Sequence, residues 1–292
     1  MKQLLILSGK GGTGKTTIAS AFIKLAEAKA FADCDVDAPN LHLVMDPFPT
    51  EKISDYYGLD KAVIDPELCT NCGICSDVCR FNAIEVQEGQ HIVDAISCEG
   101  CTLCAYLCPE KAITMVRAKA GELKLYSDNN THFSTATLAM GSGTSGLLVT
   151  QVKKQLKDVA LESEFAIIDG SPGIGCPVIA SLTGADLALI VAEPSISGFS
   201  DMKRIILTAA KLGVPIAVCV NKSDTNDELT AKIESFCWKE GIFFVGKIPF
   251  DPIAIKAVNE GKTVIDYPCI SGTATREVYA KTVQMLKETI RR

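Results

Sequence analysis

Cysteine is the residue type whose spacing in this sequence most clearly indicates chemistry. Eight of the thirteen cysteines in the 292-residue chain lie within 40 consecutive residues. They form two runs of four, in which two residues separate each of the first three cysteines and three residues precede the fourth. The runs are Cys69, Cys72, Cys75 and Cys79, followed by Cys98, Cys101, Cys104 and Cys108. Thiolates at such short spacing predict a metal-binding segment.

This spacing is that of the bacterial two-cluster ferredoxins, in which the fourth cysteine of each run binds the other cluster. The resemblance implies two [4Fe–4S] clusters with crossed ligation. One would be held by Cys69, Cys72, Cys75 and Cys108, and the other by Cys98, Cys101, Cys104 and Cys79. Zinc is the alternative, because Cys-x2-Cys pairs also suit tetrahedral Zn²⁺. Two complete four-cysteine runs favour iron–sulfur clusters.

A second candidate site lies near the start of the chain, in the glycine-rich residues 9–17. The loop follows an apolar run and opens a helical pattern, which is the context that distinguishes a phosphate loop from chance glycines. Lys15 is expected to reach the β- and γ-phosphates of a nucleotide, and the Thr16 hydroxyl to bind Mg²⁺. The expected phosphate contacts are Gly11, Gly12, Thr13, Gly14, Lys15, Thr16 and Thr17.

Alternating strand and helix patterns surround this loop. Short apolar runs predict strands at residues 2–7, 30–32, 165–168, 187–192, 216–220 and 243–245. Helical spacing predicts helices at residues 16–29, 147–156 and 276–292. This order predicts an α/β fold with a doubly wound, mostly parallel sheet, in which ligands bind at the carboxyl ends of the strands.

The composition changes to Cys, Gly, Asp and Glu between about residues 60 and 117. We therefore expect a discontinuous nucleotide-binding domain, residues 1–59 and 118–292, with a small α+β ferredoxin domain inserted at residues 60–117. The inserted segment repeats internally, although Arg80 stands where ferredoxins usually have proline. Arg80 could tune a cluster potential or contact a partner, but a simple surface substitution is the plainer interpretation.

The phosphate loop also resembles that of the MinD/ParA/nitrogenase-iron-protein class of ATPases, because Lys10 precedes Gly-Gly-Thr-Gly-Lys. In that class this lysine reaches the nucleotide of a partner subunit, which implies a homodimer with ATP sandwiched at its interface. Asp33 and Asp35 match the first switch segment of the class. The resemblance implies that Asp35 orients or activates the attacking water and that Asp33 supports the metal or the loop.

Further matches follow in the order of the class. Asp169 resembles the Walker B aspartate, which would bind Mg²⁺, and the Gly173 N–H would sense the γ-phosphate. Asn221 matches the base-recognition element. Pro249 and Asp251 match the segment that lies against adenine. Together these matches favour ATP over GTP.

The remaining five cysteines are expected to have different roles. Cys34, Cys219 and Cys237 are expected to be small buried hydrophobic residues. Cys176 lies just after the second switch segment, where the nitrogenase iron protein holds a cluster between subunits. A metal or redox role for Cys176 is therefore considered beside backbone packing, and Cys269 is a second candidate thiol.

The composition excludes several classes of protein. A net charge of -6 argues against a nucleic-acid surface and suits a redox or metalloprotein partner with a basic patch. No apolar run reaches the roughly 18 residues of a membrane span, and no signal peptide is visible. The final helix could lie on a membrane surface, but packing against the sheet is the plainer interpretation. We expect a cytoplasmic protein whose thiols bind metal rather than form disulfides.

These features resemble MinD-superfamily ATPases that contain an inserted ferredoxin domain, and three functions are consistent with them. The first is an ATPase that couples a dimer switch to electron transfer from two clusters, which would make it an ATP-dependent reductase. The second is a maturation factor for metal or iron–sulfur clusters, similar to the Mrp/Nbp35 scaffolds, although the Cys-x-x-Cys pair of those proteins is missing after Cys108. The third is a positioning ATPase of the MinD/ParA kind, which would leave eight cysteines unexplained.

Overall fold

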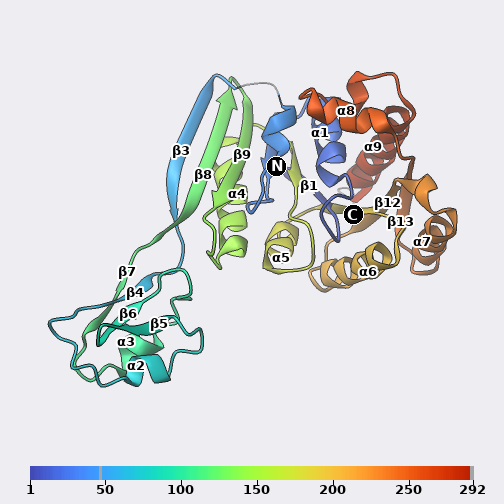
Figure 1. Ribbon diagram of the computed structural model, residues 1–292. Coiled ribbons are helices and arrows are strands. Elements are labelled where there is room, and N and C mark those ends of the chain that lie inside the picture. Colours follow the sequence, from blue (N-terminus) through green and yellow to red (C-terminus); the bar gives the residue numbers. More distant parts are fainter. Residues whose placement is uncertain (46–47, 290–292) are drawn as a thin grey trace.

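A twisted sheet forms the centre of the larger part of the molecule (Figure 1). The computed structural model describes residues 1–45 and 48–289, and within these residues the sheet has nine strands in the order β13-β12-β11-β1-β10-β2-β9-β8-β3. The first seven run parallel, and β8 and β3 extend the sheet in antiparallel fashion. The strands are β1 (Lys2–Leu7), β2 (Ala30–Asp33), β3 (Thr50–Tyr57), β8 (Lys119–Asp128), β9 (Thr131–Leu138), β10 (Phe165–Asp169), β11 (Leu187–Ala192), β12 (Ile216–Asn221) and β13 (Phe243–Ile248).

Helices cover both faces of this sheet, as the alternating pattern predicted. Leu5 and Leu7 of β1 point to the face covered by α4, α5, α6 and α7, whereas Leu4 and Ile6 point to the face covered by α1 and α9. A strand buried on both faces reads as a continuous apolar run, which is how these strands were predicted. The helices are α1 (Lys15–Leu25), α4 (Ser145–Val159), α5 (Cys176–Leu182), α6 (Ile196–Lys211), α7 (Asp227–Lys239), α8 (Pro252–Asn259) and α9 (Ile270–Thr289), with short 3₁₀ turns η1 (Leu41–Val44), η2 (Ser223–Thr225) and η3 (Val264–Asp266).

The structure corrects the predicted extent of two helices. The first begins at Lys15 and ends at Leu25, four residues before its predicted end, because Glu27 has a φ of 46° and breaks the helical path. The last begins at Ile270 rather than at residue 276. Its side chains Val278 and Leu286 are buried against the sheet, which confirms that this helix packs on the sheet. Ile290, an apolar residue of the same predicted helix, lies outside the described residues.

The edge strands β3 and β8, and the parallel strand β9 beside them, were not predicted. Almost every residue of β3 is exposed, so neither a buried apolar run nor a strict alternation marks it. β3 and β8 pair from Thr50 with Ser127 to Tyr57 with Lys119. They lead into and out of a small unit that hangs from this edge of the sheet (Figure 1).

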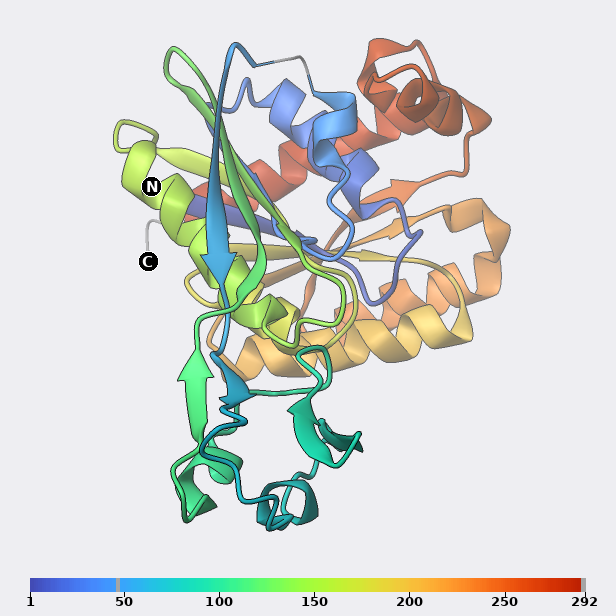
Figure 2. The same cartoon turned by 60° about the vertical axis from the view of Figure 1, so that its left-hand side comes forward.

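The small unit is built from two similar halves. Its strands pair across the halves, β4 (Lys61–Ile64) with β7 (Ile113–Val116) and β5 (Ile84–Gln87) with β6 (Gln90–Val93). One short helix belongs to each half, α2 (Ile74–Asp77) and α3 (Leu103–Leu107). Two equivalent hydrogen bonds also join the halves: the Asp65 N–H donates to the Ala112 carbonyl and the Asp94 N–H to the Ala83 carbonyl, both at 2.8 Å. The two halves are therefore interlocked rather than placed end to end (Figure 2).

None of the helices in the described part of the chain has the length and apolar character needed to cross a membrane.

Phe22 offers a direct test of the α1–α9 face. Its fully buried ring lies edge-on to Tyr279 of α9, with ring centroids 5.0 Å apart. Replacing Phe22 with Ala leaves a cavity and is expected to lower the free energy of unfolding by about 3–5 kcal/mol, measured by denaturant titration. The control is Leu161→Ala at an 82% exposed position, where the change should stay within about 0.5 kcal/mol. Equal effects of the two substitutions would contradict the assigned packing.

Candidate functional site

The glycine-rich loop joins the end of β1 to the start of α1. Gly14 is the N-cap of α1 and has a φ of 86°, a left-handed conformation that favours glycine. A Cβ atom at Gly14 would also lie 2.3 Å from the Asn221 amide nitrogen, so a side chain would break this contact. At Gly11 and Gly12 a Cβ would meet no atom within 4 Å. The loop thus packs on the protein at one end and has open space at Gly11 and Gly12, where a phosphate group would fit.

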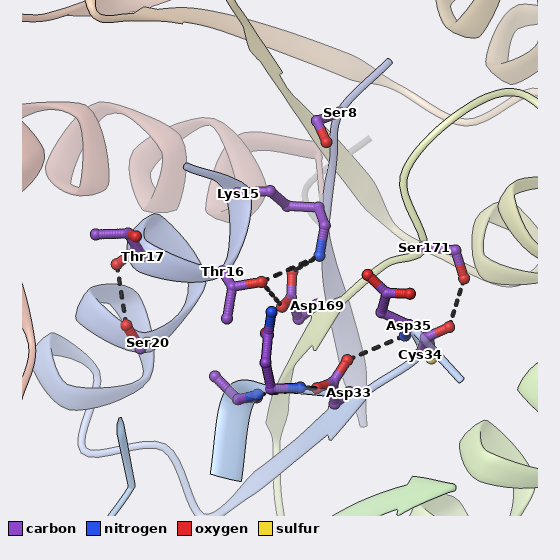
Figure 3. A network of polar contacts seen from close by, with 12 residues as sticks. Ser8, Lys15, Thr16, Thr17, Ser20, Asp33, Cys34, Asp35, Asp169 and Ser171 are labelled. Carbon is purple, nitrogen blue, oxygen red and sulfur yellow. Dashed lines mark hydrogen bonds and ion pairs between the residues drawn. The ribbon is translucent and has the colours of Figure 1, made fainter. Parts of the chain in front are cut away.

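Lys15 forms a buried ion pair with Asp169 at the end of β10. The Lys15 Nζ lies 2.5 Å from one Asp169 oxygen, and the Thr16 hydroxyl donates to the other at 2.7 Å (Figure 3). Burial by itself would lower the pKa of Lys15, but the Asp169 carboxylate, with smaller contributions from Asp33 and Asp35, raises it above its ordinary value. The lysine is therefore held as a cation. β1 and β10 are neighbours, which is why these side chains meet.

Asp33, at the end of β2, holds the loop that follows it. Its carboxylate accepts three backbone N–H bonds at 3.0 Å, from Asp35, Asn40 and Leu41. Burial and the nearby charge of Asp169 raise the pKa of Asp33 to about 7, against the lowering effects of Lys15 and these N–H groups. Of the two roles considered for Asp33, metal support and loop support, these contacts favour loop support.

Asp35 is fixed by the same loop but is partly exposed. Burial raises the pKa of its carboxyl, and the neighbouring Lys15 lowers it by less. Figure 3 shows the Asp35 side chain on the same side of the network as Lys15 and Asp169. This position, beside the lysine expected to bind phosphate, suits a carboxylate that contacts an attacking water.

The segment after β10 is bonded to the phosphate loop and to the Asp33 loop. The Gly173 N–H, which was predicted to sense a γ-phosphate, donates to the Ser8 carbonyl at 2.9 Å. The Ser171 hydroxyl donates to the Cys34 carbonyl. Gly173 has a φ of 93°, so its N–H could be redirected only by a change of this turn. Contact with a γ-phosphate therefore requires that the bond to Ser8 opens.

Lys10 lies on the exposed side of the loop and bonds within its own subunit. Its Nζ lies 3.0 Å from a Glu193 oxygen and 3.3 Å from the Ser195 hydroxyl, both just after β11. The role of Lys10 across a dimer stays a prediction. In this conformation Glu193 and Ser195 neutralise and orient it, a pairing that the sequence analysis did not identify.

A pocket of about 300 Å³ adjoins the phosphate loop. Its lining residues include Gly12 and Gly14 of the loop, Asn221 beside Gly14, and Pro249 and Phe250 just after β13. The Asn221 amide donates to the Thr13 carbonyl at 2.7 Å, which joins the base end to the phosphate end. Phosphate-binding and base-recognition residues, predicted separately, thus share one cavity.

Asp251 also lines this pocket, but its carboxylate is occupied. One oxygen caps α8 by accepting the Ile253 N–H, and the other accepts the N–H and hydroxyl of Ser271. Burial opposes ionisation, but these hydrogen bonds outweigh it and lower the pKa of Asp251 below its ordinary value. Asp251 therefore positions the helices beside the pocket rather than presenting a free carboxylate to a base.

The eight clustered cysteines line two small hollows in the small unit. One is lined by Cys69, Cys72, Cys75 and Cys108, and the other by Cys79, Cys98, Cys101 and Cys104. Each run thus contributes three cysteines to one hollow and its fourth to the other. Backbone N–H groups face two of the sulfurs at equivalent positions, Ala83 to Cys79 at 3.4 Å and Ala112 to Cys108 at 3.3 Å. Within residues 1–45 and 48–289, no three His, Cys, Asp or Glu side chains converge on a point that would hold a single metal ion.

The other cysteines lie in the larger unit. Cys34, Cys219 and Cys237 are fully buried, as predicted for small hydrophobic residues. Cys176 is exposed at the first residue of α5, and its backbone faces Gly146. Cys269 is partly buried and accepts the Gly272 N–H at 3.3 Å, so it helps to shape the start of α9.

Lys153 of α4 is a functional candidate that the sequence analysis missed. Its Nζ donates to the carbonyls of Ser181 and Thr183 at the end of α5, each at 2.6 Å. Burial lowers the pKa of this lysine. The only signal in the sequence was a lysine on the same helical stripe as the buried Val149 and Leu156.

Comparison with known proteins agrees with the arrangement of the nucleotide pocket. The family described as CobQ/CobB/MinD/ParA nucleotide binding domain matches residues 4–264. An uncharacterized protein of Methanocaldococcus jannaschii is 34% identical over 231 residues, which cover 77% of this chain and 79% of that protein. An iron–sulfur cluster carrier protein of Pyrococcus abyssi is 26% identical over 307 residues, covering 98% and 87%.

Solved structures show a similar fold. The septum site-determining protein MinD of Pyrococcus horikoshii, solved with Mg-ADP, superposes with a TM-score of 0.58 at 18% identity. The alignment covers 99% of this chain and 98% of that chain.

The Lys15–Asp169 pair gives a test in the nucleotide-free protein. Replacing Lys15 with Ala leaves a buried carboxylate without its cation, which is expected to cost about 3–5 kcal/mol of unfolding free energy. The matched control is Lys2→Ala, which breaks the exposed Lys2–Asp186 pair and should cost less than about 1 kcal/mol. Denaturant titration of the variants measures both changes. Similar costs for the two would refute the view that the buried pair organises the nucleotide site.

Proposed function

This chain belongs to the CobQ/CobB/MinD/ParA nucleotide-binding domain family of P-loop ATPases, and we propose that it couples ATP hydrolysis to electron transfer. In this proposal residues 60–117 are an inserted ferredoxin domain with two [4Fe–4S] clusters. Residues 1–59 and 118–292 form the ATPase domain, which dimerises with ATP at its interface. The clusters pass electrons from a reduced protein to an oxidised partner.

The observation that carries the proposal is the sorting of eight cysteines into two hollows of four. The sets are those expected for crossed ligation of two cubanes. In a cubane each thiolate binds a different iron, so the four sulfurs surround the cluster without converging on one ion. The absence of a single-ion site among the described residues is consistent with this geometry. The N–H groups that face Cys79 and Cys108 would stabilise thiolate charge.

The nucleotide site supports phosphoryl transfer, which requires positioning and charge rather than covalent work by the protein. When bound, Mg²⁺ neutralises phosphate charge, and Thr16 and Asp169 are the residues that would hold it. Lys15 would then leave Asp169 for the β- and γ-phosphates. Asp169 would exchange the Lys15 ammonium for Mg²⁺, and Lys15 would exchange the Asp169 carboxylate for the phosphates. Neither group would be left buried without a counter-charge.

Asp35 and Gly173 would complete this site. The raised pKa of Asp35 makes its carboxylate a better proton acceptor for water than an ordinary exposed aspartate. The Gly173 N–H would exchange the Ser8 carbonyl for a γ-phosphate oxygen. Loss of the γ-phosphate on hydrolysis would let the bond to Ser8 re-form, so the segment after β10 would adopt a different conformation before and after hydrolysis.

The charge of the small unit indicates the kind of partner. Residues 60–117 contain nine Asp or Glu and four Lys or Arg. An excess of five acidic residues would steer the unit towards a redox protein with a basic rim around its own cofactor.

A second candidate function is delivery of iron–sulfur clusters to other proteins. The similarity to the Pyrococcus carrier protein favours it, and the exposed Cys176 could hold a labile cluster between subunits. Cluster transfer to an apo-ferredoxin separates the two functions. A carrier that uses Cys176 should lose transfer in Cys176→Ala while the ferredoxin-type signals persist, whereas an electron carrier should show no transfer in either form.

The cluster assignment predicts the metal content of selected variants. Anaerobically purified protein should contain about eight irons per chain, and Cys72→Ala or Cys101→Ala should each lose about half of them because one ligand set is broken. Cys219→Ala is the control, since that thiol is buried between strands and should leave the iron unchanged. Iron and zinc analysis with electron paramagnetic resonance measures the outcome. Stoichiometric zinc without iron would disprove the assignment.

Coupling to ATP is tested by reduction of an electron acceptor. The dithionite-reduced protein should reduce a low-potential acceptor several-fold faster with MgATP than without it, because nucleotide binding changes the dimer. Lys10→Ala should keep its clusters and its MgADP binding but lose both the nucleotide-dependent dimer, measured by light scattering, and the faster reduction. Equal rates with and without MgATP in the unmodified protein would rule out ATP-gated electron transfer.

A further inference from the structure

The two halves of the small unit are alike internally but contact the larger unit differently. The loops that precede their first cysteines have the same bonds: the Cys69 N–H donates to the Asp65 carbonyl, and the Cys98 N–H donates to the Asp94 carbonyl. In the second half, however, Ile96 and Glu99 reach the loop between β9 and α4. Their counterparts in the first half, 29 positions earlier, are Glu67 and Thr70, which are exposed; in the second half Glu99 is half-buried, whereas Ile96 is itself 67% exposed.

We call residues 141–146, which lead into and begin α4, the glycine loop. A Cβ atom at Gly141 would lie 2.7 Å from a methyl carbon of Ile96, and one at Gly143 would lie 2.7 Å from a carboxylate oxygen of Glu99. Because these glycines lack side chains, the cluster segment can approach the loop backbone closely. Glu99 stands directly between two cysteines of the second hollow, Cys98 and Cys101.

The other end of the glycine loop touches the switch segment. A Cβ at Gly146 would lie 3.2 Å from the Cβ of Cys176 and 3.3 Å from its carbonyl oxygen. Cys176 begins α5, three residues after Gly173, whose N–H is expected to respond to the γ-phosphate. Lys153 then ties the far end of α5 to α4 through its bonds to Ser181 and Thr183. Helix α5 is therefore in contact with α4 at both of its ends.

Among the described residues, this set of chain connections and contacts leads from the phosphate site to the cysteine set Cys79, Cys98, Cys101 and Cys104. The connections run from Gly173 to Cys176, from Cys176 to Gly146, along the glycine loop to Gly143, and from Gly143 to Glu99. Helices α2 and α3, one in each half, lie together at the end of the unit far from the sheet (Figures 1 and 2), so the two sets differ through Ile96 and Glu99 rather than through these helices.

We propose that the glycine loop passes the nucleotide state to the cysteine set Cys79, Cys98, Cys101 and Cys104, so that one of the two pseudo-equivalent clusters is regulated and the other is not. The regulatory consequence rests on the proposed function, because it requires clusters in both sets. Glu99 is a positioning residue in this scheme: its charge lies beside two ligands, and movement of the loop at Gly143 would change its distance from them.

Hydrogen exchange tests the relay without electron transfer. The as-isolated protein is compared with and without a non-hydrolysable ATP analogue and Mg²⁺. Exchange should change several-fold in residues 94–101 and 139–146 and stay unchanged in the equivalent residues 65–72, whose amides are bonded in the same way. No change in residues 94–101, or an equal change in both halves, would overturn the proposal.

Two variants locate the connection. Gly146→Ala places a methyl group against the Cys176 backbone and should abolish the response of residues 94–101 while residues 169–176 still respond to nucleotide. Persistence of the response in residues 94–101 would show that the signal takes another route. Leu147→Ala provides the control, because this neighbouring side chain of α4 is 55% exposed, and it should leave both responses intact.

Potentiometric titration followed by electron paramagnetic resonance tests the asymmetry of the clusters. Nucleotide should shift the midpoint of one cluster, and Glu99→Gln should shift that midpoint and reduce its response, whereas Glu67→Gln should do neither. Shifts of both midpoints by nucleotide would refute the assignment.

If iron analysis finds no clusters, the proposed redox function fails, but the exchange pattern still decides whether the relay exists. If reduction is ATP-dependent but the exchange pattern is absent, only the relay fails.

Discussion

The buried Lys15–Asp169 ion pair is the constraint on which the nucleotide site depends. A lysine ammonium and a carboxylate can both remain charged in the interior only while each has an opposite charge or several hydrogen bonds beside it. Without nucleotide they satisfy each other at 2.5 Å, with Thr16 on the second carboxylate oxygen. Phosphates and Mg²⁺ are the ligands that can separate the pair without leaving a buried charge. The site is thereby suited to a cation–anion complex such as MgATP.

The neighbours of this pair explain how a change at the phosphates could reach other parts of the chain. Asp33 holds the loop after β2 through three N–H bonds, and the segment after β10 is bonded to Ser8 and to the Cys34 carbonyl. These strands are adjacent in the sheet, so the loops at their carboxyl ends share one network. Displacement of one carboxylate or one N–H therefore alters loops that are far apart in sequence.

The position of the small unit depends on the antiparallel edge of the sheet. β3 and β8 form a long ribbon that brings both ends of the unit to the same place, and β9 leads from this ribbon to α4. The unit is thus anchored beside the glycine loop rather than held by a free linker. The two halves of the unit are joined by equivalent bonds and are alike internally. They differ in how they contact the glycine loop at the start of α4. This asymmetry is what would allow two similar cysteine sets to differ in function.

The central strands, the phosphate loop and the division of eight cysteines into two runs could be predicted without the structure, because each of these is encoded in short-range spacing. Continuous apolar runs identified β1, β10, β11 and β12, while the exposed β3 carried no such pattern and was found only through its pairing with β8. The tertiary structure decided that Asp33 holds a loop, that the Asp251 carboxylate is occupied by α8 and Ser271, and that Lys10 rests on Glu193. It also revealed the contacts of Lys153 and Glu99. Lys10, Lys153 and Glu99 contact residues at least 28 positions away in the chain, and Ser271 lies 20 positions from Asp251. Asp33 bonds to residues two to eight positions ahead of it, but only in the turn that the folded loop adopts. No local sequence pattern encodes these partners.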